Sequence, residues 1–218
     1  GGYSTNGRAW RICIPSTSPL FGNATVNNLL EFLGMVVNVW LECEDESNEA
    51  ACILALGDNT SAIGWLFSSS KFPAESLAHK AHLLAARQLA TLLIKHDHCL
   101  ASQHIKGELN LVADMLSFVG THRGKPHPIA HDNPTDQILT QRFHQHYPSQ
   151  IPANFDISPL PRRILSWITM ALQTHESYLI LAKKVPMKPT TKLGDGGSDS
   201  APRRASTLTP SSLLYPPP

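Results

Sequence analysis

One short apolar segment constrains the fold more than any other part of the sequence. Residues 50–56 are all apolar, and the segment ends at Gly57, Asp58 and Asn59. A continuous apolar run of this length, bounded by turn residues, is typical of a strand buried on both faces of a sheet. Such a strand needs a packed layer on each side, so we expect an α/β architecture.

Periodic patterns on both sides of this strand support the same architecture. The predicted elements, in order, are a hairpin around Asn6-Gly7, a helix over 26–41, the strand over 50–56, helices over 60–67 and 75–96, a strand over 100–106 and a helix over 108–119. Strands alternating with helices in this way predict a mixed sheet flanked by helices.

Composition divides the chain into three parts. We expect a folded domain over 1–120, a connector with short helices over 121–184, and a tail over 185–218. Pro and His residues interrupt the start of the connector. Pro, Ser, Thr and Gly dominate the tail and offer little apolar surface to bury, so we expect it to be disordered.

The charge balance and the apolar runs exclude some classes of protein. The chain has 18 basic and 17 acidic side chains, so no global positive field marks a nucleic-acid partner and any such binding is local. The longest apolar run, over 29–41, is interrupted by Glu31 and Asn38 and is shorter than the roughly 20 residues that span a bilayer. We expect no membrane association and an intracellular location, in the cytoplasm or nucleus, without secretion.

Cysteines and histidines are candidate metal ligands. The four cysteines lie far apart, at Cys13, Cys43, Cys52 and Cys99. Their spacing fits neither a zinc site nor a disulfide scaffold, so we expect reduced and mostly buried thiols. The histidines form two close pairs, His79 with His82 and His96 with His98. Neither pair has an acidic or cysteine partner at matching spacing, so we predict no zinc site.

Three carboxylates stand out because of their positions. Asp58 ends the apolar strand, Glu31 lies in an otherwise apolar helix, and Asp114 follows Ala113 in the last predicted helix. Each has an ordinary alternative: Asp58 as a helix cap, Glu31 at the rim of an apolar face, and Asp114 as a solvated helix position. Partial burial of Glu31 makes an isolated charge costly, and a cation would relieve that cost. Oxygen ligands suit Mg²⁺, and paired ions about 4 Å apart can hydrolyse a phosphodiester.

Three segments resemble motifs of a known family. Residues 28–33 read Asn-Leu-Leu-Glu-Phe-Leu, residues 56–62 read Leu-Gly-Asp-Asn-Thr-Ser-Ala, and residues 104–117 contain Gly-Glu-Leu-Asn-Leu-Val-Ala-Asp-Met-Leu-Ser. Together they resemble the ribonuclease H-like domain of retrotransposon reverse transcriptase polyproteins, over roughly residues 1–120. The last segment is the most specific of the three.

The resemblance implies an activity and a set of residues. Such domains hydrolyse the RNA strand of RNA/DNA hybrids with two Mg²⁺ ions, or Mn²⁺. Glu31, Asp58 and Asp114 would be the catalytic, metal-binding carboxylates. Asn59 and Asn110 would bind substrate, Asn59 through the hybrid backbone, and Asn110 could instead brace the metal-binding helix.

This sequence also departs from the family pattern. The family has a further Asp on its first strand, but no Asp or Glu precedes Glu31, and Gly1-Gly2-Tyr3 looks like the second strand. We therefore expect a fold incomplete at its N-terminus and inactive as this fragment, which leaves its status as an enzyme open. The mobile His of longer family members has no match, and His104 is not assigned that role.

The arrangement most resembles polyproteins of tyrosine-recombinase retrotransposons, of the DIRS and Ngaro type. That resemblance implies an upstream reverse transcriptase and a downstream recombinase, with residues 121–218 leading toward the latter. No recombinase signature is present, so no strand transfer is expected. The alternative is a non-catalytic nucleic-acid-binding or packing module left from a decayed retroelement.

Overall fold

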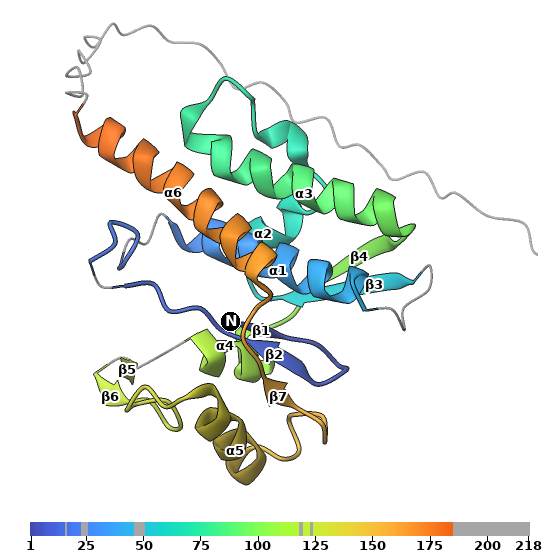
Figure 1. Ribbon diagram of the computed structural model, residues 1–218, viewed down its shortest axis with the longest axis vertical. Helices are drawn as coiled ribbons and strands as arrows, with labels where there is room; N and C mark the ends of the chain where they lie inside the picture. Colours follow the sequence, from blue (N-terminus) through green and yellow to red (C-terminus); the bar gives the residue numbers. More distant parts are fainter. Residues whose placement is uncertain (16, 23–25, 46–50, 118–119, 123, 185–218) are drawn as a thin grey trace, which may run out of the picture. The chain divides into compact units, whose positions relative to one another are not determined.

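The computed structural model describes residues 1–15, 17–22, 26–45, 51–117, 120–122 and 124–184 (Figure 1). The segment expected to be a disordered tail, 185–218, lies outside the described residues. The strands are β1 (Gly2–Tyr3), β2 (Arg8–Trp10), β3 (Cys52–Gly57), β4 (Cys99–His104), β5 (Thr121–His122), β6 (Lys125–Pro126) and β7 (Asp156–Ile157). The α-helices are α1 (Asn27–Cys43), α2 (Thr60–Trp65), α3 (Lys80–His96), α4 (Leu111–Ser117), α5 (Asp136–His146) and α6 (Arg162–Lys184), with short 3-10 turns η2 (Ser69–Lys71), η3 (Leu77–His79) and η4 (Gly107–Leu109).

The mixed α/β class is confirmed, and the strands form three small sheets. β1 and β2 form the expected antiparallel hairpin, whose turn includes Gly7 at a φ of +92°. β7 pairs with β2 in parallel, and β3 pairs with β4 in parallel over six registered residue pairs. β5 and β6 form a separate antiparallel pair. Within the described residues, β1 and β3 each pair along one edge only, so the single mixed sheet that we expected is not formed.

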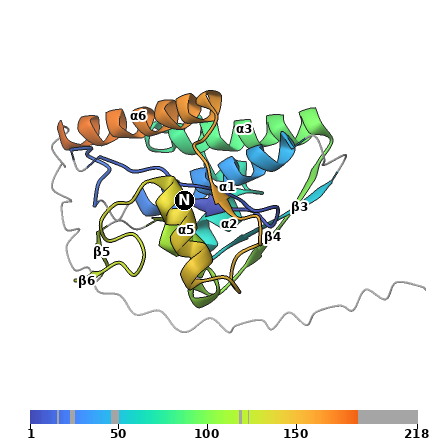
Figure 2. The ribbon, with the colours of Figure 1, turned by 60° about the horizontal axis from the view of Figure 1, so that its bottom comes forward.

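The helices gather on two sides of the strands. Figure 1 shows α1, α3 and α6 together on one side of the strands and α5 on the other, and Figure 2 shows the same separation after rotation. α1 contacts β3, and α3 packs against both α1 and α6. On the second side α4 packs on β1 and α5 packs on β7.

β3 is not buried on both faces, contrary to our expectation. Exposed and half-buried side chains alternate along the strand, and Leu54 and Leu56 are 56% and 50% exposed. Ile53 and Ala55 face the other way and pack against the larger apolar core. The helices cover only one face of the β3–β4 pair. Because β3 carries apolar residues on both faces, its sequence lacks the alternation of polar and apolar residues that marks a half-buried strand.

The larger core lies between the three helices of the first side. Phe32 and Val36 of α1 are fully buried, and Ile164 of α6 is fully buried as well. α3 faces them with small residues, including Ala81 and Ala85, which let neighbouring helices approach closely. The expected helix over 75–96 begins later, at Lys80, because its first residues form the 3-10 turn η3.

The segment that we expected to be a connector packs into the same unit as the residues before it. Ala9 and Leu116 share a second apolar core with Leu139, Phe143 and Phe155. Thr135 caps α5, and its side-chain oxygen accepts a hydrogen bond from the Ile138 N–H at 3.4 Å. Arg11 also donates to the Asp136 carboxylate at 2.8 Å. Residues 124–184 therefore complete this unit through long-range contacts that local sequence patterns do not reveal.

The cysteines also differ from expectation. Cys43 is buried, but Cys13, Cys52 and Cys99 are exposed, and all four are free thiols. Cys52 and Cys99 are exposed because they lie on the uncovered face of β3 and β4. In the part of the chain that the structure describes, no helix is long and apolar enough to cross a membrane.

Candidate functional site

The carboxyl ends of β3 and β4 lie side by side and carry the predicted site residues. Asp58 follows β3 directly, and Gly57 of β3 is in register with His104 at the end of β4. Because the two strands are parallel, the segments that leave them emerge at the same edge. This edge therefore collects residues from the turn before α2 and from the turn before α4.

The Asp58 carboxylate is held by the turn that leads into α4. The Asn110 side-chain amide donates a hydrogen bond to Asp58 Oδ1 at 3.1 Å. On the other side, a Cβ added at Gly107 would lie 3.3 Å from Asp58 Oδ2, so a glycine at this position leaves room for the carboxylate. The Asp58 main-chain oxygen lies 3.1 Å from His104 Nε2. Asn110 thus orients Asp58, and His104 braces the backbone of the same residue.

Asn59 builds the start of α2 and links it to α1. Its Oδ1 accepts a hydrogen bond from the Ala62 N–H at 3.0 Å, which is an N-cap interaction. Its amide nitrogen donates to Asn28 Oδ1 at 2.8 Å. Asn28 comes from the first turn of α1, three residues before Glu31. Asn59 therefore positions α2 against α1. Asn28 lies next to the site and was not singled out from the sequence, although it is the first residue of the 28–33 motif.

The three predicted carboxylates influence one another. Glu31 keeps one side open to solvent, but the surrounding protein removes part of its hydration, and this desolvation is the main reason that its pKa is raised. The negative charges of Asp58 and, more weakly, Asp114 raise the pKa of Glu31 further, while the amino group of Gly1 lowers it. Carboxylates from α1, the β3–α2 turn and α4 thus lie within electrostatic reach of one another.

This arrangement does not yet amount to a metal centre. Among the residues that the structure describes, no three His, Cys, Asp or Glu side chains are grouped so that they could hold a metal ion. The ungrouped side chains include those of Glu31, Asp58 and Asp114 and those of the histidine pairs. The carboxylates are neighbours that repel one another, and their side chains as placed do not fit a three-ligand Mg²⁺ site.

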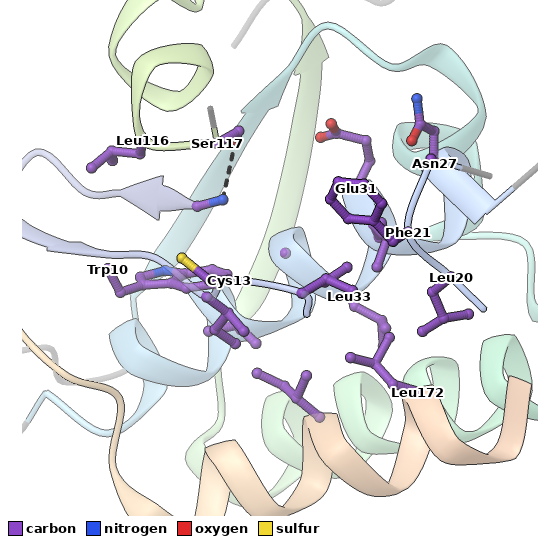
Figure 3. Close-up of a pocket in the computed structure, with 18 residues that line it drawn as sticks. Trp10, Cys13, Leu20, Phe21, Asn27, Glu31, Leu33, Leu116, Ser117 and Leu172 are labelled. Atoms are coloured by element: carbon purple, nitrogen blue, oxygen red, sulfur yellow. Dashed lines mark hydrogen bonds between the residues drawn. The ribbon is translucent and has the colours of Figure 1, made fainter. Parts of the chain in front are cut away.

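An apolar cavity of about 530 Å³ adjoins Glu31. Trp10, Leu33 and Leu172 line it, and Figure 3 shows Leu172 on α6 and Trp10 near the hairpin. Its polar members include Ser117, whose Oγ accepts a hydrogen bond from the Gly1 nitrogen at 3.1 Å (Figure 3). Residues of the hairpin, α1, α4 and α6 line the cavity. Its walls suit apolar side chains better than an anionic ligand.

Comparison with known protein families, characterised proteins and solved structures gave no match to this chain. Its function must therefore be inferred from its own residues and their geometry.

Proposed function

We propose that residues 1–120 belong to a ribonuclease H-like domain that hydrolyses the RNA strand of RNA/DNA hybrids once its sheet is completed. The observation that carries this proposal is the electrostatic coupling of Glu31 to Asp58 and Asp114. These residues come from three separate elements, and they are the three that the sequence motifs single out. Perturbed pKa values cluster at functional sites, and here two neighbouring carboxylates raise the pKa of Glu31.

Open strand edges leave room for a further element of the sheet. β1 and β3, like β4 and β7, each pair along one edge only within the described residues, and Asp58 directly follows β3. We propose that a further strand pairs with both β1 and β3 and joins the two sheets. If that strand carried a fourth carboxylate, it could complete the ligand set that Glu31, Asp58 and Asp114 do not form by themselves.

Each residue has a defined part in this proposal. Glu31, Asp58 and Asp114 would bind the two Mg²⁺ or Mn²⁺ ions of the completed domain, and Asn110 orients Asp58 for that purpose. Asn59 fixes α2 against α1 and would lie near the hybrid backbone. The ions would supply an activated water and would stabilise the leaving oxygen of the phosphodiester. In its polyprotein the domain would lie between a reverse transcriptase and a recombinase.

A second function is favoured by the absence of a three-ligand group among the described residues. In this alternative the chain is a non-catalytic nucleic-acid-binding or packing module. The carboxylates would then be remnants whose mutual repulsion is tolerated because they lie at the solvent edge of the fold.

The deciding experiment compares Mg²⁺-dependent cleavage of an RNA/DNA hybrid by this chain and by a version extended upstream with the candidate strand. We expect cleavage by the extended version alone. Asp58→Asn in the extended version should lower the rate at least about 100-fold, because it removes a charged ligand without changing side-chain volume. Glu75→Gln, at an exposed carboxylate elsewhere on the chain, is the matched control and should leave the rate unchanged.

Two outcomes would overturn the proposal. If neither version cleaves the hybrid although circular dichroism shows both to be folded, the non-catalytic function is correct. If Asp58→Asn and Glu75→Gln cleave equally well, Asp58 is not a ligand. Binding of the hybrid without cleavage, at equal affinity in both variants, would identify a binding module.

A further inference from the structure

Two exposed cysteines face each other at the start of the β3–β4 pair. Cys52 is the first residue of β3, Cys99 is the first residue of β4, and the two are in direct register. Registered residues on adjacent strands point to the same face of the sheet. Here that face is the one that the helices leave uncovered, so both thiols are accessible from solvent.

The spacing of paired strands fits the Cα separation of a disulfide. Neighbouring strands lie about 4.8 Å apart, within the roughly 4.4–6.8 Å between the Cα atoms of disulfide-bonded residues. The Cys99 side chain is close enough to Cys52 to be the main cause of its raised pKa. The backbone beside them is fixed because the Cys99 N–H donates to the Ala51 carbonyl at 3.1 Å and the Ala51 N–H donates to His98 Nδ1 at 3.0 Å. Closing the bond therefore needs rotation of two side chains and little backbone movement.

We propose that Cys52 and Cys99 are a reversible dithiol/disulfide pair that exchanges with small disulfides such as oxidised glutathione. One cysteine thiolate attacks the glutathione disulfide, forms a mixed disulfide and releases one glutathione thiolate. The second cysteine thiolate attacks the protein sulfur of that mixed disulfide and releases the other. The protein loses two electrons and two protons, and oxidised glutathione gains them as two thiols.

The closeness of the two thiols predicts how the exchange depends on pH. Interaction with the Cys99 side chain is the main cause of the raised pKa of Cys52, with smaller contributions from desolvation and from the charge of Cys99. Only the thiolate is nucleophilic, so the reaction should be faster in mildly alkaline solution than at neutral pH.

The pair is independent of the carboxylate edge described above. Cys52 and Cys99 begin the two strands, whereas Asp58 and His104 lie at their far ends. The cross-link would close a loop that contains α2 and α3, and closing such a loop restricts the unfolded chain. We therefore expect a change in stability, with the carboxylate edge left intact.

The test treats the full reduced chain with oxidised glutathione in mildly alkaline buffer, followed by acid quenching and peptide mapping by mass spectrometry. We expect a loss of two hydrogens, a peptide linking Cys52 to Cys99, recovery of both thiols with dithiothreitol, and a rise of several degrees in Tm. The folded chain should form the linkage at least tenfold more readily than the chain in concentrated urea. Cys13→Ser, at an exposed cysteine outside β3 and β4, is the control and should form the same linkage.

Cys52→Ser gives a second readout, because Cys99 should then stop at the mixed disulfide and retain one glutathione. The proposal is overturned if each cysteine of the original chain independently retains a glutathione. It is also overturned if the linkage forms only between two chains, or forms as readily in urea as in the folded protein.

Discussion

His82 should make this protein sensitive to mild acid. It lies on α3 with only 8% of its surface exposed, and its Nδ1 has no hydrogen-bond partner among the residues that the structure describes. Its ring centroid is 4.8 Å from that of Trp65 and 5.0 Å from that of Phe72. Two further imidazoles, His79 and His175, lie at 5.6 and 6.2 Å. An added proton would place a charge in an apolar site between two helices.

The size of the stability loss in acid follows from the shift in the pKa of His82. Burial, followed by the charges of His175 and His79, lowers the pKa of His82 from 6.5 to about 4. In the unfolded chain His82 binds a proton near pH 6.5. Between about pH 6.5 and pH 4 the unfolded state therefore binds more protons than the folded state. The stability associated with neutral His82 is complete above about pH 6.5 and is lost as the pH falls to about 4. At 1.36 kcal/mol for each pKa unit, the loss is about 3 kcal/mol.

The assay is urea unfolding followed by circular dichroism between about pH 7.5 and 4.5. His82→Leu has a similar volume and no titratable group, so its free energy of unfolding should fall by about 3 kcal/mol less than that of the original chain. His146→Gln, at the exposed end of α5, controls for the loss of an imidazole. If His82→Leu and the original chain lose stability in parallel over this range, His82 is not the group that titrates and the reasoning fails.

Two further substitutions test the carboxylate edge. Asn59→Ala removes the α2 cap and the hydrogen bond to Asn28, and should cost about 1 kcal/mol in urea unfolding; an unchanged midpoint would show that neither bond contributes. Glu31→Gln should raise Tm at neutral pH, because the raised pKa of Glu31 means that folding disfavours its charged form. That gain should shrink as the pH falls through the raised pKa of Glu31 and be absent below the ordinary pKa of a glutamate. A lower Tm at neutral pH would contradict the proposed repulsion from Asp58 and Asp114.

Local patterns in the sequence determined the existence of most elements. The helical periodicity over 26–41 became α1, and the Asn6-Gly7 signal became the hairpin turn with Gly7 in the left-handed region. Asn59 caps α2 as an Asn at such a junction can. These features depend on residues within a few positions of one another, so the sequence contains the information directly.

Only the tertiary structure decided which faces are covered and which residues meet. The sequence of β3 is apolar on both faces, and the placement of the helices leaves Leu54, Leu56 and Cys52 exposed. The docking of β7 on β2 and the bond between Asn110 and Asp58 join residues that are far apart along the chain. Such contacts are chosen by the packing of whole elements, because each residue alone fits several environments about equally well, and only the assembled core selects one of them.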